Sequence, residues 1–262
     1  MTTLSGQSKD DDDDAAYEAE SRTVAYKAGD TECEGYLAQP KLGETGPTAP
    51  AKRPGVLVIH DWMGVSAELK RKCDQLAGAG YIAFGADVYG KAVRPASVKE
   101  AGEASGKFKS DPKLLRARVA AGLETLKKQP GVDTNKIAAI GFCFGGTAVL
   151  DIACSGADID GVVSFHGGLK LADAKEMQNI KCKVLVLHGA DDPFVPEADV
   201  NAFIKEMRAT KADWQLHLYS GAVHSFTNPG AGGDNSKGAA YNKSADERSW
   251  DDMEQFFDEL FE

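Results

Sequence analysis

The sequence predicts a single α/β domain, built on a mostly parallel, doubly wound sheet flanked by helices, with an antiparallel hairpin at its N-terminal end. Short, almost continuous apolar runs recur along the chain, as expected of strands buried on both faces of a parallel sheet. Segments with helical periodicity separate these runs. Strands that alternate with helices after an initial hairpin favour a doubly wound sheet with an antiparallel start.

The predicted strands begin with the hairpin. Residues 22–28 and 32–38 flank Gly29 and Asp30, a turn pair suited to joining two antiparallel strands. Residues 41–52 are rich in Gly, Pro and Thr and predict a loop. The later strands are expected at Val56–His60, Tyr81–Gly85, Ile137–Ile140, Gly161–Phe165, Val184–His188 and Trp214–Tyr219.

The predicted helices share apolar residues at helical spacing and a start or stop signal. They are expected around residues 69–77, ended by Gly78; after Asp111 as N-cap; after the glycine-rich stretch at 141–146, ending near Gly156; from Pro196; and from Ser244, with Glu247 completing a capping box. The sequence assigns no element to residues 92–110 and leaves open whether this segment acts as a lid.

Length and composition bound the domain organisation. With 262 residues and 42% hydrophobic content, the chain can bury one large core. We expect one domain over residues 21–262. Residues 1–20 contain the run Asp10–Asp14 with little apolar content, which predicts a disordered acidic tail.

Charge and cysteine content indicate partners and compartment. A net charge of −10 argues against non-specific binding to nucleic acid or anionic lipid, and no apolar run approaches the ~20 residues of a membrane span. Five scattered cysteines, an odd number, fit neither a disulfide framework nor a zinc site. We expect a monomer or small homo-oligomer in the cytoplasm, or in the periplasm or medium if a leader peptide has been removed.

The strongest motif lies where the predicted strand Ile137–Ile140 ends. The chain reads Gly-Phe-Cys-Phe-Gly-Gly over residues 141–146 and then enters a helix. This is the G-x-nucleophile-x-G elbow of α/β-hydrolases with Cys143 as the nucleophile. The N–H groups at the start of the helix favour the thiolate, which is the reactive form. The alternatives are a buried structural cysteine and a phosphate-binding loop, but the Gly-Lys-Ser/Thr of a phosphate loop is missing.

A nucleophile of this kind needs a base, and the base needs an acid that orients it. Asp191 and Asp192 follow the strand Val184–His188, and His224 follows the last strand. The order nucleophile, acid, histidine is that of this fold, so we expect Cys143, His224 and one of the two aspartates to form the triad. His166 also ends an apolar run and is a candidate pocket wall.

Acyl transfer further requires two N–H donors for the developing oxyanion. The residue after the nucleophile, Phe144, is expected to supply one. The loop after the first parallel strand, which contains Trp62, is expected to supply the other. The expected pocket walls include four aromatic residues, Trp62, Tyr89, Phe194 and Phe226.

Together these motifs resemble the dienelactone hydrolase (carboxymethylenebutenolidase) family. The resemblance rests on residues 141–146, on the Gly-x-x-Asp-x-x-Val-Pro pattern over 189–196, on His224-Ser-Phe, and on the acid-aromatic-x-Gly pattern over 61–64. It covers about residues 22–260 and implies that the triad acid is Asp192. It also implies hydrolysis of a small ester or enol-lactone without a metal or organic cofactor.

Two positions depart from the pattern of the family's best-known members. Asp61 stands where they carry a glutamate that holds the resting thiol, and Asn228 stands where they carry an arginine that binds the substrate carboxylate. Lys91 and Arg94, in the loop after Tyr89, are the candidate replacements for that positive charge. Asp61, Lys91 and Arg94 therefore join the predicted substrate-binding residues.

Two other classes of function compete with an ester hydrolase. In a thiol redox sensor, Cys143 would be oxidised and a second cysteine would resolve it. Cys154 lies three helical turns away and is too far to do so. A non-catalytic binding module of the same fold would be expected to lack a triad residue, and none is missing here.

Overall fold

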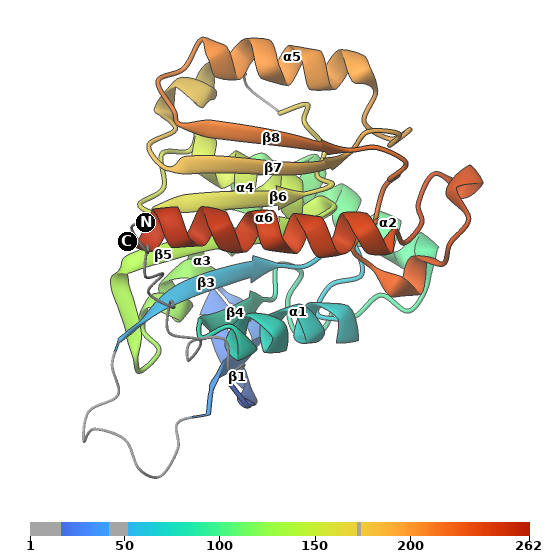
Figure 1. The fold of residues 1–262 in the computed structure, drawn as a ribbon. Helices are drawn as coiled ribbons and strands as arrows, with labels where there is room; N and C mark the ends of the chain where they lie inside the picture. Colours follow the sequence, from blue (N-terminus) through green and yellow to red (C-terminus); the bar gives the residue numbers. More distant parts are fainter. Residues whose placement is uncertain (1–16, 42–51, 172–173) are drawn as a thin grey trace, which may run out of the picture.

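The computed structural model describes residues 17–41, 52–171 and 174–262, and its strands form one sheet (Figure 1). In the described residues the sheet has eight strands in the order β1-β2-β4-β3-β5-β6-β7-β8. Their bounds are Ala19–Ala28, Thr31–Pro40, Arg53–Ile59, Ile82–Ala86, Val132–Phe142, Gly161–Phe165, Lys183–Gly189 and Trp214–Tyr219 for β1 to β8. Only the β1–β2 and β2–β4 pairs are antiparallel, so the predicted mostly parallel sheet is confirmed. Most of the predicted loop at 41–52 lies outside the described residues.

The N-terminal hairpin starts earlier than predicted. β1 begins at Ala19 and pairs with β2 along its whole length. The backbone N–H of Tyr17 donates to the carbonyl of Gly78, 2.8 Å away, at the end of helix α1. The predicted tail over 1–20 is therefore wrong at its C-terminal end, because these backbone groups are paired. Residues 1–16 lie outside the described residues.

The helices cover both faces of the sheet. Their bounds are Ala67–Gly78, Val98–Lys109, Pro112–Lys127, Phe144–Cys154, Glu197–Arg208 and Lys243–Phe261 for α1 to α6. One core cluster joins α1 and α6 to the sheet, and a second joins α3, α4 and α5 to the other face. Side chains of β3 alternate between the clusters: Leu57 and Ile59 belong to one, Val56 and Val58 to the other. This alternation explains why the run is apolar throughout.

Two helices differ from their predictions. α2 occupies residues 98–109, for which no helix was predicted; the Ser97 hydroxyl caps it by accepting from the Glu100 N–H. α6 begins at Lys243 rather than Ser244, and its cap is Asn242, whose side chain accepts from the Ala245 N–H. An Asn side chain satisfies a free N–H as well as a Ser does, so the helix starts at the first good cap.

The parallel strands β3, β5, β6, β7 and β8 all point the same way, so their carboxyl ends meet at one edge of the sheet. The loops that follow them converge there, as in other open α/β sheets. No helix in the described part of the chain is long and apolar enough to cross a membrane.

Candidate active site

Cys143 occupies a tight turn between β5 and α4, with φ of 53° and ψ of −111°. A positive φ is costly for a residue other than glycine, by roughly 1–3 kcal/mol, and is held only by its surroundings. The flanking glycines explain how this turn fits. A Cβ on Gly141 would lie 2.1 Å from the carbonyl oxygen of Gly145, and a Cβ on Gly145 would lie 2.2 Å from that of Ile59. The predicted strand-turn-helix elbow is therefore confirmed.

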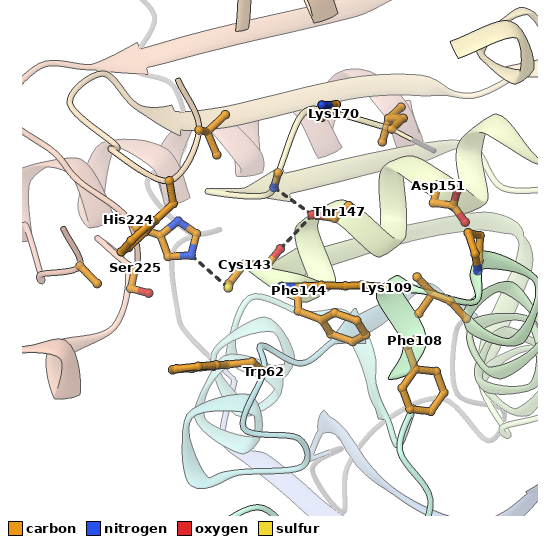
Figure 2. Close-up of a pocket in the computed structure, with 17 residues that line it drawn as sticks. Trp62, Phe108, Lys109, Cys143, Phe144, Thr147, Asp151, Lys170, His224 and Ser225 are labelled. Atoms are coloured by element: carbon orange, nitrogen blue, oxygen red, sulfur yellow. Dashed lines mark hydrogen bonds between the residues drawn. The ribbon is translucent and has the colours of Figure 1, made fainter. Parts of the chain in front are cut away.

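The sulfur of Cys143 faces the imidazole of His224 (Figure 2). The distance from Cys143 Sγ to His224 Nε2 is 3.0 Å, and His224 Nδ1 lies 2.8 Å from Asp192 Oδ2. The Asp192 side chain is fully buried and His224 is 13% exposed. The neighbouring Asp191 is exposed and accepts a hydrogen bond from the Gly221 N–H instead. The structure thus brings together the three predicted residues and leaves Asp191 out.

Backbone hydrogen bonds hold Asp192 and His224 in place. The other carboxylate oxygen of Asp192 accepts from the Phe194 N–H at 2.8 Å. His224 lies in the loop between β8 and α6. Its N–H donates to the Gly238 carbonyl at 3.2 Å, and its carbonyl accepts from the Ala240 N–H at 3.0 Å. Because both the backbone N–H and the backbone carbonyl of His224 are hydrogen-bonded, its side chain is held in a defined direction.

The surroundings of His224 favour its charged form. Burial lowers the pKa of His224, but the hydrogen bonds and charges of Asp192 and Cys143 outweigh burial and raise it to about 10. An imidazolium with this pKa keeps its proton throughout the neutral range. A positively charged imidazole beside a sulfur is the kind of surrounding that makes a cysteine a better nucleophile.

The two residues predicted to donate to the oxyanion, Phe144 and Trp62, line the same cavity as Cys143. Phe144 is the first residue of α4, so its N–H has no acceptor within the helix. The carbonyl of Trp62 accepts from the Tyr89 hydroxyl at 3.0 Å, which ties the loop to the segment that follows β4. Asp61 Oδ1 accepts from the Met63 N–H at 2.8 Å and stabilises the same turn. Donation to an oxyanion by Phe144 and Trp62 remains a prediction.

A cavity of about 750 Å³ opens at the sulfur. It follows one face of α4, along which Cys143, Thr147 and Asp151 are spaced by four residues (Figure 2). Most of its wall is apolar and comes from five different segments: Trp62, Phe108, Pro112, Leu115, Phe144, Leu171, Phe194 and Val195. Its size suits a small organic molecule.

Besides Cys143 and His224, the charged residues that line the cavity are Lys109, Lys170 and Asp151. Asp151 is neutralised by Arg116, which donates to both of its oxygens at 2.8 Å. Lys109 and Lys170 are exposed and make no ion pair within the described parts of the chain. The cavity therefore carries a positive charge at its rim although the protein as a whole is acidic.

Of the residues predicted to bind substrate, Phe194 lines the cavity. Its ring is 61% exposed, and its centroid lies 5.4 Å from that of His224. Asp61 does not line the cavity, because its carboxylate is engaged in its own turn, and burial raises the pKa of that carboxyl. Tyr89 does not line the cavity either, and its hydroxyl donates to the Trp62 carbonyl.

The other predicted contacts are also outside the cavity lining. Lys91 pairs with Glu34 at 3.2 Å, and Arg94 pairs with the buried Asp87 at 3.0 Å. Both cations are thus held against the hairpin side of the sheet. His166 and Phe226 are fully enclosed and are not cavity walls. These predictions of cavity residues were wrong for one reason: the side chains make tertiary contacts that no local sequence pattern specifies.

Sequence reasoning missed Phe108, Lys109, Thr147 and Lys170. Thr147 had a signal, because it stands one helical turn after Cys143 and faces the same side of α4. Phe108 and Lys109 end the helix α2 that was not predicted. Lys170 follows β6 in a loop without a recognisable motif.

The other four cysteines are buried away from the sulfur of Cys143. Cys154 ends α4, and a helix of 11 residues separates its ends by about 15 Å at ~1.5 Å per residue. A disulfide needs Cα atoms within about 7 Å. Cys154 therefore offers no resolving thiol. Among the described residues, no three His, Cys, Asp or Glu side chains are grouped to hold a metal ion.

Comparisons with known proteins identify the family. The sequence matches the dienelactone hydrolase family over residues 36–261. Protein usf of Aquifex pyrophilus is 31% identical over 212 residues, which cover 78% of this chain and 86% of that protein. The human carboxymethylenebutenolidase homolog is 28% identical over 181 residues, covering 65% of this chain and 69% of its own. The crystal structure of a dienelactone hydrolase-like promiscuous phosphotriesterase from metagenomic libraries is 38% identical, with a TM-score of 0.86 over 94% of this chain and 100% of that chain. This chain belongs to the dienelactone hydrolase family.

Proposed function

We propose that this hydrolase cleaves small carboxylic esters and lactones, with Cys143 as the nucleophile, His224 as the acid and base, and Asp192 as the group that orients His224. One observation carries the proposal: Sγ, the imidazole and the carboxylate form a continuous chain with contacts of 3.0 and 2.8 Å. The chain ends at the mouth of a cavity that admits a small molecule. Nucleophilic catalysis needs this order of contacts.

In the first half-reaction the Cys143 thiolate attacks the carbonyl carbon, and the carbonyl π electrons move to oxygen. The N–H groups of Phe144 and Trp62 stabilise that oxyanion. When the intermediate collapses, the bond to the leaving alkoxide breaks and the His224 imidazolium donates its Nε2 proton to the alkoxide. The products are an alcohol and an acyl-thioester on Cys143; with a lactone, the alcohol remains attached to the acyl group.

In the second half-reaction neutral His224 takes a proton from water, and the hydroxide oxygen attacks the thioester carbon. Collapse of this intermediate expels the thiolate and releases the carboxylic acid. His224 keeps the proton, which restores the thiolate–imidazolium pair. Asp192 holds the Nδ1–H throughout, so that Nε2 always faces the reacting atoms.

A thiolate leaves a tetrahedral intermediate more readily than an amine does, so amides are expected to be poor substrates. We expect 4-nitrophenyl acetate to be hydrolysed faster than 4-nitroacetanilide by a factor on the order of 10³, which corresponds to about 4 kcal/mol in barrier. A dienelactone serves as the lactone substrate in the same test. Release of 4-nitrophenol and 4-nitroaniline measures both reactions. Equal rates for ester and amide, or no ester turnover, would reject the proposal.

The rim lysines favour substrates whose acyl part ends in an anion. Replacing both Lys109 and Lys170 by methionine is expected to raise the KM for mono-4-nitrophenyl succinate by about 2- to 5-fold, the value of exposed charge contacts. The KM for the uncharged 4-nitrophenyl butyrate should stay constant. Lys99→Met is a matched control, because Lys99 is exposed on the same helix and does not line the cavity. Equal changes for both esters would show that these charges do not select the substrate.

A further inference from the structure

His166 is a buried histidine outside the cavity that contacts two parts of the catalytic centre. It follows β6 with φ of 40°, and its backbone N–H donates to the Leu187 carbonyl at 2.9 Å. Its Nδ1 accepts from the backbone N–H of Cys143 at 3.1 Å, and the Phe165 carbonyl accepts from the same N–H at 3.0 Å. Its Nε2 lies 2.9 Å from the hydroxyl of Thr227. Both ring nitrogens are therefore used in directed contacts.

The donor and acceptor roles follow from the Cys143 contact. A backbone N–H can only donate, so Nδ1 of His166 must carry a lone pair. The proton then sits on Nε2 and is donated to the Thr227 hydroxyl oxygen. A protonated His166 would place two N–H groups face to face at Cys143. Burial, and next the positive charges of His224 and Lys72, hold the pKa of His166 well below 6.5, which agrees with a permanently neutral ring.

Thr227 lies in the same loop as His224, three residues further along. The His166 and His224 rings also pack edge to face, with centroids 5.2 Å apart. One side of His166 thus contacts the backbone of the nucleophile, and the other side contacts the loop that carries the base. His166 thus links two segments that are far apart in the chain, since Cys143 and His224 are separated by 81 positions.

We propose that His166 is a positioning residue that fixes the elbow of Cys143 against the His224 loop through its two ring nitrogens, and so sets the distance between Sγ and the imidazole. It does not touch the substrate cavity, so it acts through Cys143 and His224. Its effect on catalysis rests on the proposed function, whereas its effect on the thiol does not. A change of about 1 Å in such a contact can cost on the order of 10²-fold in rate.

Four variants test this role. His166→Phe keeps an aromatic ring in the contacts with Phe142 and Phe226 but removes both nitrogens. His166→Asn keeps an acceptor close to the Nδ1 position. Thr227→Val removes the hydroxyl at nearly constant volume, and Thr227→Ser restores it. We expect kcat for 4-nitrophenyl acetate to fall by about 10- to 100-fold in His166→Phe with KM changed less than about 3-fold, because misplacement affects the reacting atoms and leaves the cavity intact.

The other variants test whether the effect depends on the contacts of His166 with the Cys143 N–H and the Thr227 hydroxyl. His166→Asn should lose less kcat than His166→Phe, Thr227→Val should lose about 3- to 10-fold, and Thr227→Ser should stay within about 2-fold of wild type. The double variant of His166→Phe and Thr227→Val should lose no more than His166→Phe alone, since the shared contact is already absent. Fully additive losses, or a Thr227→Ser variant as impaired as Thr227→Val, would overturn the proposal.

The rate at which iodoacetamide alkylates Cys143, measured against pH, needs no ester turnover. Cys143→Ala supplies the background, and the other four cysteines are buried. In His166→Phe and in Thr227→Val we expect the rise in alkylation rate to shift to higher pH, because a looser contact with His224 stabilises the thiolate less. Profiles that coincide with wild type in both variants would reduce His166 to a packing role. Wild-type protein with a responsive thiol but no ester turnover would refute the proposed function alone.

Discussion

Cys143→Ala is expected to lower kcat for 4-nitrophenyl acetate by a factor on the order of 10⁴ or more, because the variant lacks the atom that forms the acyl bond. The residual rate would come from the oxyanion donors and from His224 acting as a base toward water. The variant should fold normally, since alanine is smaller than cysteine and Cys143 is only partly buried. Steady-state kinetics together with a thermal melt separate lost chemistry from lost structure.

Cys154→Ala is the matched control for this result. Cys154 ends the same helix and is 1% exposed, but its thiol is turned into the core. We expect this variant to lose about 1 kcal/mol of stability through a small cavity and to keep its kcat. Ester turnover in Cys143→Ala at more than about one-tenth of the wild-type rate, with Cys154→Ala unchanged, would mean that another group attacks the substrate.

Asp192→Asn is expected to have the second-largest effect, lowering kcat by about 10²- to 10⁴-fold. An asparagine whose NH₂ group faces Nδ1 would force the proton onto Nε2, where it points at the sulfur as the wrong tautomer. The hydrogen bond that Asp192 accepts from His224 also helps raise the pKa of His224 to about 10, so its loss lowers that pKa. Since a less basic imidazole takes the thiol proton less readily, thiolate formation should begin at higher pH. Iodoacetamide alkylation against pH measures this shift.

Asp191→Asn isolates the effect of position from that of charge. Asp191 adjoins Asp192 but is exposed, and its carboxylate accepts from the Gly221 N–H at 2.9 Å. An asparagine there can still accept that hydrogen bond, so both kcat and the alkylation profile should stay close to wild type. Equal losses in the two variants would indicate a general electrostatic effect and would remove Asp192 from its orienting role.

The features that the sequence predicts well are those that local patterns determine. The apolar runs identify the buried strands, and the elbow glycines are required by contacts of 2.1 and 2.2 Å that any side chain would violate. The ends of β5, β7 and β8 fall at one edge because parallel strands place their carboxyl ends together. The meeting of Cys143 with His224 follows from that rule together with chain order.

The cavity wall was predicted poorly because it depends on tertiary contacts. Arg94 follows β4, where a cation that binds the substrate was expected, but it pairs with the buried carboxylate of Asp87 and does not line the cavity. α2 escaped prediction because its buried face is made of Ala101, Ser105 and Phe108, a weak apolar pattern. Gly102 and Gly106 lower its helix propensity further. The helix is stabilised by its Ser97 cap and its packing, and it places Phe108 and Lys109 in the cavity wall.

Mass spectrometry of the protein during turnover tests the central claim most directly. Wild type mixed with excess 4-nitrophenyl acetate and quenched with acid is expected to carry one acetyl group, on the peptide that contains Cys143, and hydroxylamine should remove it as it does other thioesters. Cys143→Ala should carry none. An acetyl group on a different residue that forms and decays at the rate of turnover, with Cys143 left unmodified, would contradict a mechanism through the cysteine thiolate.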